Sequence, residues 1–431
     1  MKNIAKFGSS QIRLLVVMYF AYAVTMIMRQ SLMAISPELI ADPAVGLTKT
    51  DFGKILAYGN LGGMTGKMIF GWSTDKFGGK SNFLVALISV ALYLILFGLN
   101  TDFTGFCVIF FLIAVSKSGG WPSLAKLIEN WYHPSQYGRV WGAISTSSRI
   151  GTIIATMGFG YLLRYLTWSQ TLYVAAAVGL SFATVWFIFV TEKPDEQVVE
   201  GSFDNEIDHS EHKFFNKTVG YALLDFSKSL RVWLIFLAMM GLTVMMNFLD
   251  FVPMFLKETL NISTSDAVMA ASAFPFGSFM AVLIGGYIFD ALSPKAITRV
   301  MGVLMIISVL CMVLILNLDK LGLAADQNLT LVQACLFVFG FSISPSYYLP
   351  MSIFSIKYGG PFSGALISLL DLGGYLASAI SSFTVGYVAD LPNGWYKVIL
   401  MLIAIGLVTS TLTILFLHGE AKEEEKQELA V

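Results

Sequence analysis

About twelve apolar stretches run along this chain, each long enough to cross the roughly 30 Å hydrocarbon core of a bilayer at about 1.5 Å per helical residue. They cover residues 12–36, 52–73, 82–100, 104–128, 139–163, 169–191, 231–256, 266–289, 296–318, 330–352, 361–388 and 396–418. Lipid offers no partner to backbone polar groups, so such stretches must form helices. A content of 56% hydrophobic and 13% charged residues leaves too little polar surface for a soluble globule of this length. We therefore expect an all-α integral membrane protein with twelve transmembrane helices.

The loops between these stretches differ in positive charge. An even number of spans puts both termini on one side, and the basic residues of the loops indicate which side that is. Loops on the side of the termini carry Lys76, Lys80, Lys126, Arg139, Lys295, Arg299 and Lys357. The opposite loops carry little beyond Lys49, Arg164, Lys257, Lys320 and Lys397. We expect a multi-pass protein of the inner (plasma) membrane with both termini cytoplasmic.

The chain divides around a polar, acidic segment at residues 192–230, which we interpret as a cytoplasmic linker. It separates a six-helix bundle at 1–191 from a second at 231–418, and residues 419–431 form an acidic cytoplasmic tail. The halves resemble each other, because Gly71 to Asp75 closes the second span much as Gly286 to Asp290 closes the eighth. Two pseudo-symmetric bundles derived from a duplicated unit are the expected architecture.

Several classes of function are disfavoured. The net charge is −1 and no basic face is evident, so we expect no nucleic-acid partner. Cys107, Cys311 and Cys335 fall inside apolar stretches without metal-type spacing, and we expect neither a metal site nor a cofactor. No histidine-rich or nucleophile constellation lies at membrane depth, so an enzyme is not expected.

Charged side chains inside the spans are the candidate functional residues. Burying an ion in hydrocarbon costs several kcal/mol unless it is paired or faces water. Arg29 and Arg149 lie in the first half, and Asp250 and Asp371 occupy similar places in the second. The repeat relates Arg149 to Asp371, which form either a site or an interdomain gate pair. Further candidates for contact with substrate are Tyr22, Lys67, Lys117 and Trp121, the last next to a proline that interrupts the fourth span.

Residues 71–80, Gly-Trp-Ser-Thr-Asp-Lys-Phe-Gly-Gly-Lys, resemble the loop signature of the major facilitator superfamily. Within it, Phe20-Ala21-Tyr22 with Met28-Arg29-Gln30, Gly119-Gly120-Trp121-Pro122 and Leu372-Gly373-Gly374 are similar to stretches of the organophosphate:phosphate antiporter family. The resemblance implies that Arg29 looks toward a bound phosphate and that Lys67 matches a lysine of the second helix. It also implies a gating role, through closure of the two halves, for Asp75, Lys76, Lys80 and Asp290.

The same resemblance has two departures. The family's second phosphate-binding arginine, on the seventh helix, falls near Met245, and its fifth-helix histidine falls near Ser148. An anionic substrate need not be a phosphate ester here.

We expect a secondary active transporter, by symport or antiport, that moves a small anionic or zwitterionic organic solute by alternating access. Arg29 with Lys117 or Arg149 would bind the anionic group. Asp250 and Asp371 would either carry coupling protons, because burial raises the pKa of a carboxyl group, or bind a cationic group. The alternatives are an organophosphate/inorganic phosphate exchanger and a ligand sensor on a transporter scaffold. We expect a monomer in the lipid bilayer.

Overall fold

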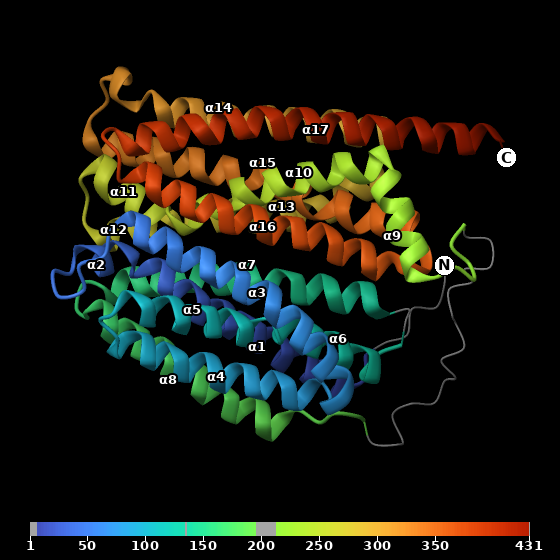
Figure 1. Ribbon diagram of the computed structural model, residues 1–431, viewed down its shortest axis with the longest axis horizontal. Helices are drawn as coiled ribbons and strands as arrows, with labels where there is room; N and C mark the ends of the chain where they lie inside the picture. Colours follow the sequence, from blue (N-terminus) through green and yellow to red (C-terminus); the bar gives the residue numbers. More distant parts are fainter. Residues whose placement is uncertain (1–6, 134–135, 195–212, 431) are drawn as a thin grey trace. The chain divides into compact units, whose positions relative to one another are not determined.

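The protein is described by a computed structural model that covers residues 7–133, 136–194 and 213–430, apart from the side chains of residues 286–291, 294, 352, 424 and 426–430. Over these residues the regular structure is entirely helical (Figure 1), which confirms the all-α prediction. The chain divides into two compact units, Met1–Glu206 with Ile262–Ser272, and Ile207–Asn261 with Ala273–Val431. We call them the first and second units.

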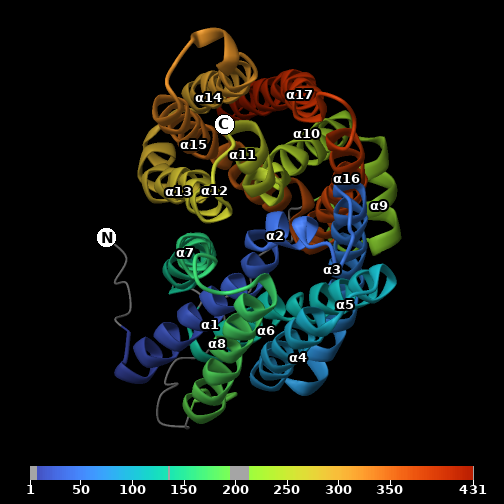
Figure 2. The same ribbon diagram turned by 90° about the vertical axis from the view of Figure 1, so that its left-hand side faces the viewer.

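The first unit contains the helices α1 (Ser9–Ala34), α2 (Ser36–Ala41), α3 (Lys49–Phe77), α4 (Gly79–Leu99), α5 (Phe103–Lys117), α6 (Gly120–Trp131), α7 (Tyr137–Leu162), α8 (Trp168–Phe189) and α12 (Thr264–Ala271). Figure 2 shows α4, α5 and α8 within this unit. Its core is apolar and aromatic, with Phe83 stacked on the fully buried Trp186 at 4.3 Å between ring centroids.

The second unit contains α9 (Val219–Lys228), α10 (Leu230–Asn247), η3 (Phe248–Asp250), α11 (Val252–Leu260), α13 (Ala273–Ala291), α14 (Pro294–Leu316), η4 (Leu318–Leu321), α15 (Ala325–Gly359), η5 (Gly360–Phe362), α16 (Ser363–Ala389) and α17 (Gly394–Ala430). In Figure 1 the long helices α10, α14, α16 and α17 share one direction. Their buried faces hold large apolar side chains such as Phe248, Phe274 and Phe339.

Helix pairing follows the same scheme in both units. In the first unit α1 packs on α7, α3 on α5 and α4 on α8. In the second, α10 packs on α16, α13 on α15 and α14 on α17. Counted as spans, these are first with fifth, second with fourth, and third with sixth in each unit. This repeated pairing confirms the two pseudo-symmetric bundles.

Short polar residues start many of these helices, as helix termini require. The side chain of Asp102 accepts a hydrogen bond from Gly105 N at the start of α5, and that of Thr167 accepts one from Gln170 N at the start of α8. Glycines then set how closely helices cross. A Cβ on Gly277 of α13 would lie 1.9 Å from the Phe337 carbonyl oxygen of α15, so this crossing is a direct backbone contact.

Among the described residues, nine helical stretches are long and apolar enough to cross a membrane. One of them runs through both α15 and α16, whereas α3 and α7 are not included. These two helices carry polar or charged side chains within their apolar stretches, with Lys67 on α3 and the run Ser145 to Arg149 on α7. Every expected stretch corresponds to one α-helix or to two α-helices in succession, and in the stretch 231–256 the short η3 helix lies between α10 and α11.

Three boundaries differ from the sequence-based expectation. Part of the predicted linker is the helix α9, and its neighbour Phe214 is only 1% exposed. The predicted tail begins inside α17, which continues to Ala430 and is tied to α14 where Lys295 pairs with Glu425 at 2.5 Å. Residues 262–272 belong to the first unit although their neighbours on both sides belong to the second.

Candidate site in the first unit

Among the candidate residues, Arg149 forms hydrogen bonds within its own helix that give the position of its guanidinium group. It lies on α7 with a partly buried side chain, and Nη1 donates to the Ser145 carbonyl oxygen at 2.9 Å and to Ser148 Oγ at 3.2 Å. The guanidinium is therefore folded back by one turn toward the start of α7, the direction that long helical side chains favour. A guanidinium fork of five donors held in this way suits a carboxylate or a phosphate.

Arg29 lies at a different level of the same unit. The helices α1 and α7 run parallel, because Thr146 Oγ1 bonds Tyr19 Oη at 3.2 Å and, further along both helices, a Cβ on Gly151 would lie 2.4 Å from the Ala23 carbonyl oxygen. From that second contact Arg29 is six residues ahead on α1, and Arg149 is two residues behind on α7. At about 1.5 Å per residue the two arginines are separated by roughly 12 Å along the helices. The Arg149 side chain is folded back away from Arg29, so the two arginines would meet on one small anionic group only if the Arg29 side chain extended toward Arg149.

An aromatic cluster lies beside the Arg149 level. The ring of Tyr22 on α1 contacts Trp121 on α6 at 5.4 Å between centroids, and Trp121 lies against Trp141 on α7 at 4.6 Å. Trp121 is 42% exposed, so part of its ring is not covered by other side chains. The sequence analysis named Tyr22 and Trp121 but missed Trp141, which lies one turn before Ser145 on α7. A tryptophan at the start of a span resembles an interfacial residue, and nothing in the sequence indicated that Trp141 contacts Trp121.

The fourth span is interrupted as expected, but the break at Ser118 and Gly119 lies three to four residues before the proline. Helix α5 ends at Lys117 and α6 begins at Gly120, so Pro122 lies in the first turn of α6, where its missing amide costs nothing. Ser118 stabilises the break by donating its hydroxyl to the Gly63 carbonyl oxygen at 2.9 Å. This break sets the direction of α6 and with it the position of Trp121.

The two candidate lysines lie on α3 and α5 of the same unit. Lys67 is exposed on α3, and Lys117 is the partly buried last residue of α5.

The candidate carboxylates belong to the second unit. Asp250 is 7% exposed and ends the short η3 helix, which breaks the seventh span before Pro253. Asp371 is partly buried in the middle of α16. The sequence analysis did not predict the break at η3, which holds Asp250 at a helix interruption instead of within a continuous span.

The loop between α3 and α4 is organised by Glu192 and Asn82, which the sequence analysis did not single out. Gly78 adopts φ 83°, which places the start of α4 against the carboxylate of Glu192. Glu192 accepts hydrogen bonds from Gly79 N at 2.8 Å and Lys80 N at 2.7 Å, a favourable place for a negative charge at a helix N-terminus. Asn82 adds bonds to the carbonyl oxygens of Ser73 and Gly78. The conformation of this loop is therefore fixed within the first unit.

The predicted gating residues occupy the surface of this loop. Asp75 is exposed, and Lys76 lies over the rings of Trp72 and Phe77 at 5.1 and 5.3 Å. Lys80 lies 5.4 Å from the Phe187 ring centroid. The side chain of Asp290 falls outside the described residues.

A second polar cluster joins α12 to the rest of the first unit. Arg164, just after α7, bonds Ser265 Oγ through Nε at 2.8 Å and Asp266 through Nη2 at 3.2 Å. Thr264 donates its hydroxyl to the Glu38 carboxylate, and Met269 fills the space left by Gly160. The Arg164–Asp266 pair is nearly half exposed and contributes at most about 1 kcal/mol, so packing at Gly160 carries most of the attachment.

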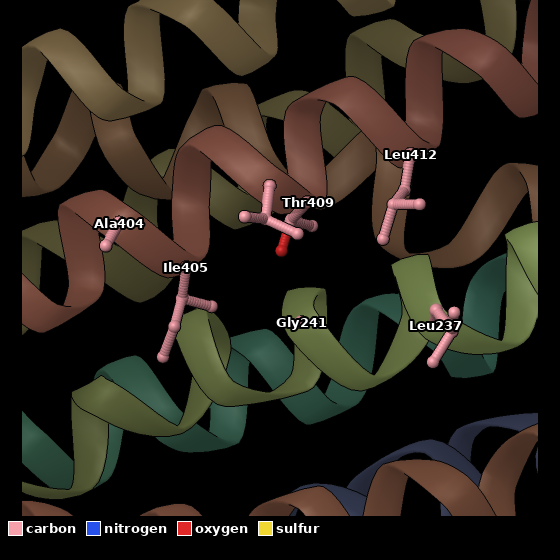
Figure 3. Close-up of a pocket in the computed structure, with 7 residues that line it drawn as sticks. Leu237, Gly241, Ala404, Ile405, Thr409 and Leu412 are labelled. Atoms are coloured by element: carbon pink, nitrogen blue, oxygen red, sulfur yellow. The ribbon is translucent and has the colours of Figure 1, made fainter.

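The pocket found in the second unit does not suit an anion. It lies between α10 and α17 with a volume of about 410 Å³ (Figure 3), and Leu237, Ala404, Ile405 and Leu412 line it. Thr409 supplies the one hydroxyl of its lining, and no lining side chain is charged. In the described residues no group of histidine, cysteine, aspartate and glutamate could hold a metal ion.

Comparison with known proteins places the chain in a family. The model of the Major Facilitator Superfamily matches residues 18–382, so the chain belongs to this superfamily of membrane transporters. A solved bacterial homologue of the human lysosomal transporter Spinster has a TM-score of 0.73, with 14% identity and coverage of 96% of this chain and 98% of that one. A D-xylose-proton symporter has a TM-score of 0.72, with 12% identity and coverage of 94% and 97%. At these identities the structures show the fold alone.

Curated relatives are similar over nearly the whole chain. The membrane sensor protein UhpC of Salmonella typhimurium is 23% identical, with coverage of 95% of this chain and 92% of that protein. A probable hexose phosphate transport protein of Chlamydia muridarum is also 23% identical, with coverage of 92% and 89%. A probable galactarate/D-glucarate transporter of Bacillus subtilis is 21% identical, with coverage of 88% and 84%. These relatives confirm the resemblance to the organophosphate:phosphate antiporter family.

Proposed function

We propose that this transporter moves a small anionic or zwitterionic organic solute across the inner membrane by alternating access, coupled to protons. The observation that carries the proposal is the combination of the Arg149 guanidinium with the aromatic cluster of Tyr22, Trp121 and Trp141. A guanidinium binds the anionic group of a solute, and an exposed indole face binds its ring or carbon skeleton. Lys67 and Lys117 add positive charge to the same unit.

The separation of the two arginines bears on the substrate class. Arg149 takes the anionic group that lies beside the aromatic cluster. Arg29, roughly 12 Å further along the helices, takes a second polar or anionic group only if the solute is long enough. A solute with an anionic group at each end uses both arginines, and a shorter monoanion uses one.

Proton coupling is assigned to Asp250 and Asp371 of the second unit. A carboxyl group inside a membrane protein can exchange a proton as its surroundings change between wet and dry, because burial favours the neutral form. Binding of a cationic group of a zwitterionic substrate is the other role for these two residues. In this proposal both termini are cytoplasmic, since the loops on their side carry more lysine and arginine.

Two measurements test the function. The first is a thermal-shift screen of the purified protein against dicarboxylates, sugar acids, phosphate esters, amino acids and small peptides, because a ligand of the folded state raises its melting temperature. The second is uptake of each hit into vesicles with and without an inward proton gradient. Accumulation above equilibrium that depends on the gradient supports the proposal. Exchange that requires internal inorganic phosphate instead identifies an organophosphate/phosphate exchanger.

A sensor is the second candidate, and the similarity to a membrane sensor protein over 95% of the chain favours it. The same assay separates the two functions. A sensor binds its ligand and shows a thermal shift, yet vesicles that contain it take up no more ligand than empty vesicles do. Measurable turnover excludes a pure sensor.

A further inference from the structure

The short helix α9 has one buried side, which packs within the second unit. Ala222 and Phe226 are fully buried, and α9 contacts α10 and α16. Phe214, just before the helix, packs edge-on against Phe226 at 5.6 Å between ring centroids. The helix is ten residues long, too short to cross a bilayer.

A polar network fixes the rotation of α9 about its own axis. Asp225 accepts a hydrogen bond from Lys213 Nζ at 2.8 Å and another from the Tyr358 hydroxyl of α15 at 3.0 Å. Burial of this carboxyl opposes its ionisation, but the bonds from Lys213 and Tyr358 outweigh burial and lower the pKa of Asp225. With Asp225 held on α15, the outward face of α9 is determined.

That outward face is apolar. Val219, Leu223 and Leu224 are 50%, 42% and 62% exposed. At about 100° per residue they fall within an arc of about 140°, together with the small residues Gly220 and Ser227. The side chain of Lys228 lies just beyond the edge of this arc, next to Leu224. Contiguous exposed apolar side chains of this kind indicate an interaction surface.

The chain that follows α9 indicates what covers this face. The spanning helix α10 begins at Leu230, directly after Ser229, with Leu230 72% and Trp233 47% exposed. The indole N–H of Trp233 donates to the Ser227 carbonyl oxygen of α9 at 2.8 Å, and tryptophan is enriched where hydrocarbon meets headgroups. In Figure 1, α9 runs across the direction of α10 and α16 at one end of the second unit. The apolar face of α9 is thus continuous with the lipid-facing surface of α10.

We propose that α9 lies in the headgroup layer of the leaflet at which α10 begins, with Val219, Leu223 and Leu224 in contact with acyl chains. Lys217, which lies over the Tyr221 ring at 5.4 Å, and Lys228 are both exposed at one margin of this face and lie among the phosphates of the headgroups. A helix with an apolar face, a basic margin and too little length to span is typical of a membrane-surface element. The linker is therefore held to the membrane at its end, next to the second unit.

The proposal is tested with spin labels on the full-length protein in vesicles of phosphatidylcholine and phosphatidylglycerol. The buried residues Cys107, Cys311 and Cys335 are first replaced by alanine, and size-exclusion chromatography checks the fold. A nitroxide is then attached to Leu223→Cys, Leu224→Cys or Lys228→Cys, and to Ile306→Cys, an exposed position in the middle of α14 that serves as a lipid reference. Collision rates with oxygen, which partitions into lipid, are compared with those of a water-soluble nickel chelate.

We expect labels at 223 and 224 to collide more with oxygen than with the nickel chelate, as at 306, and the ratio to reverse at 228. Equal access of the chelate to 223, 224 and 228 would show that α9 faces water and would overturn the proposal. Low access of both reagents at 223 and 224 would show that protein covers the face, which also contradicts it. The measurement does not depend on transport, so its outcome is separate from that of the proposed function.

Discussion

At the scale of single residues, the candidate role of Arg149 depends on where its guanidinium lies and not only on its being a charge within an apolar stretch. Its guanidinium is held by Ser145 and Ser148, one turn from Trp141, whereas Arg29 lies at another level of α1. The sequence identified both arginines from the cost of burying a charge. It could not reveal their separation, because that depends on how α1 and α7 are aligned at Gly151 and Ala23.

Substitution of the two arginines should have different effects on ligands of different length. Arg149→Ala should weaken binding of a short monoanion by about 10- to 100-fold, since charged hydrogen bonds contribute about 1.5–3 kcal/mol each. Arg29→Ala should leave that monoanion nearly unaffected and weaken only a dianion that reaches both levels. Arg149→Lys should restore little, because an ammonium lacks the planar fork. Isothermal titration with a monoanionic and a dianionic hit checks this. Equal losses for the monoanion in both alanine variants would show that the arginines act at one place.

Trp141 should contribute to affinity without contributing much to folding. Trp141→Ala should weaken a ring-bearing ligand about fivefold, because an aromatic contact is worth about 1 kcal/mol beyond the area it buries. The Trp141→Phe variant should keep most of the affinity for the ligand, and it should have the melting temperature of the unmodified protein. Trp233→Ala, an exposed tryptophan of the second unit, is the matched control and should bind normally. Normal binding by Trp141→Ala would remove this residue from the site.

At the scale of elements, the positions of the helices follow from the apolar stretches, but their interruptions follow only in part. The break in the fourth span was expected from Pro122, although it lies at Ser118 and Gly119, whereas the break at η3 that holds Asp250 was not predicted. The sequence analysis did not predict helix α9, because its apolar residues follow a strongly acidic segment and the average composition of residues 192–230 is polar. Tertiary contacts with α15 and α16 are what order it.

Glu192 should stabilise the start of α4. Glu192→Gln removes the charge that accepts the two backbone N–H groups of Gly79 and Lys80, and it should lower the free energy of unfolding by about 1 kcal/mol. Glu129→Gln is the control, because Glu129 forms an exposed pair with Lys126 on α6 and should have almost no effect. Melting temperatures in detergent provide the measurement. A loss in Glu129→Gln as large as that in Glu192→Gln would contradict the capping role.

At the scale of the whole molecule, the two-bundle architecture was predictable from the number of spans and from the repeated motifs. The division of the chain between the units was not, since residues 262–272 join the first unit through contacts of Arg164 and Gly160. Sequence order alone assigns that segment to the second half. The roles of Asp250 and Asp371 stay predictions of the same kind, made from charge and depth.

Substitution of Asp371 should distinguish proton coupling from the exchange of substrate. Asp371→Asn mimics the protonated carboxyl group, so counterflow between labelled and unlabelled substrate should continue while accumulation driven by a pH gradient is lost. Asp319→Asn, in the loop after α14, should behave as the unmodified protein does. Loss of exchange as well would indicate that Asp371 binds a cationic group of the substrate. Full accumulation by Asp371→Asn would exclude the residue from coupling.

The attachment of α12 has a consequence for biosynthesis. A ribosome that has synthesised the chain through α8 has not yet made the segment that covers Gly160 and pairs with Arg164. The first unit is completed only after α10 and α11 have been inserted and residue 272 has emerged. Until then its α7 surface is exposed to chaperones and membrane proteases. During this interval a chain whose synthesis has stopped before residue 262 keeps the α7 surface exposed, whereas a chain that continues covers it. Chaperones and proteases can therefore distinguish the two.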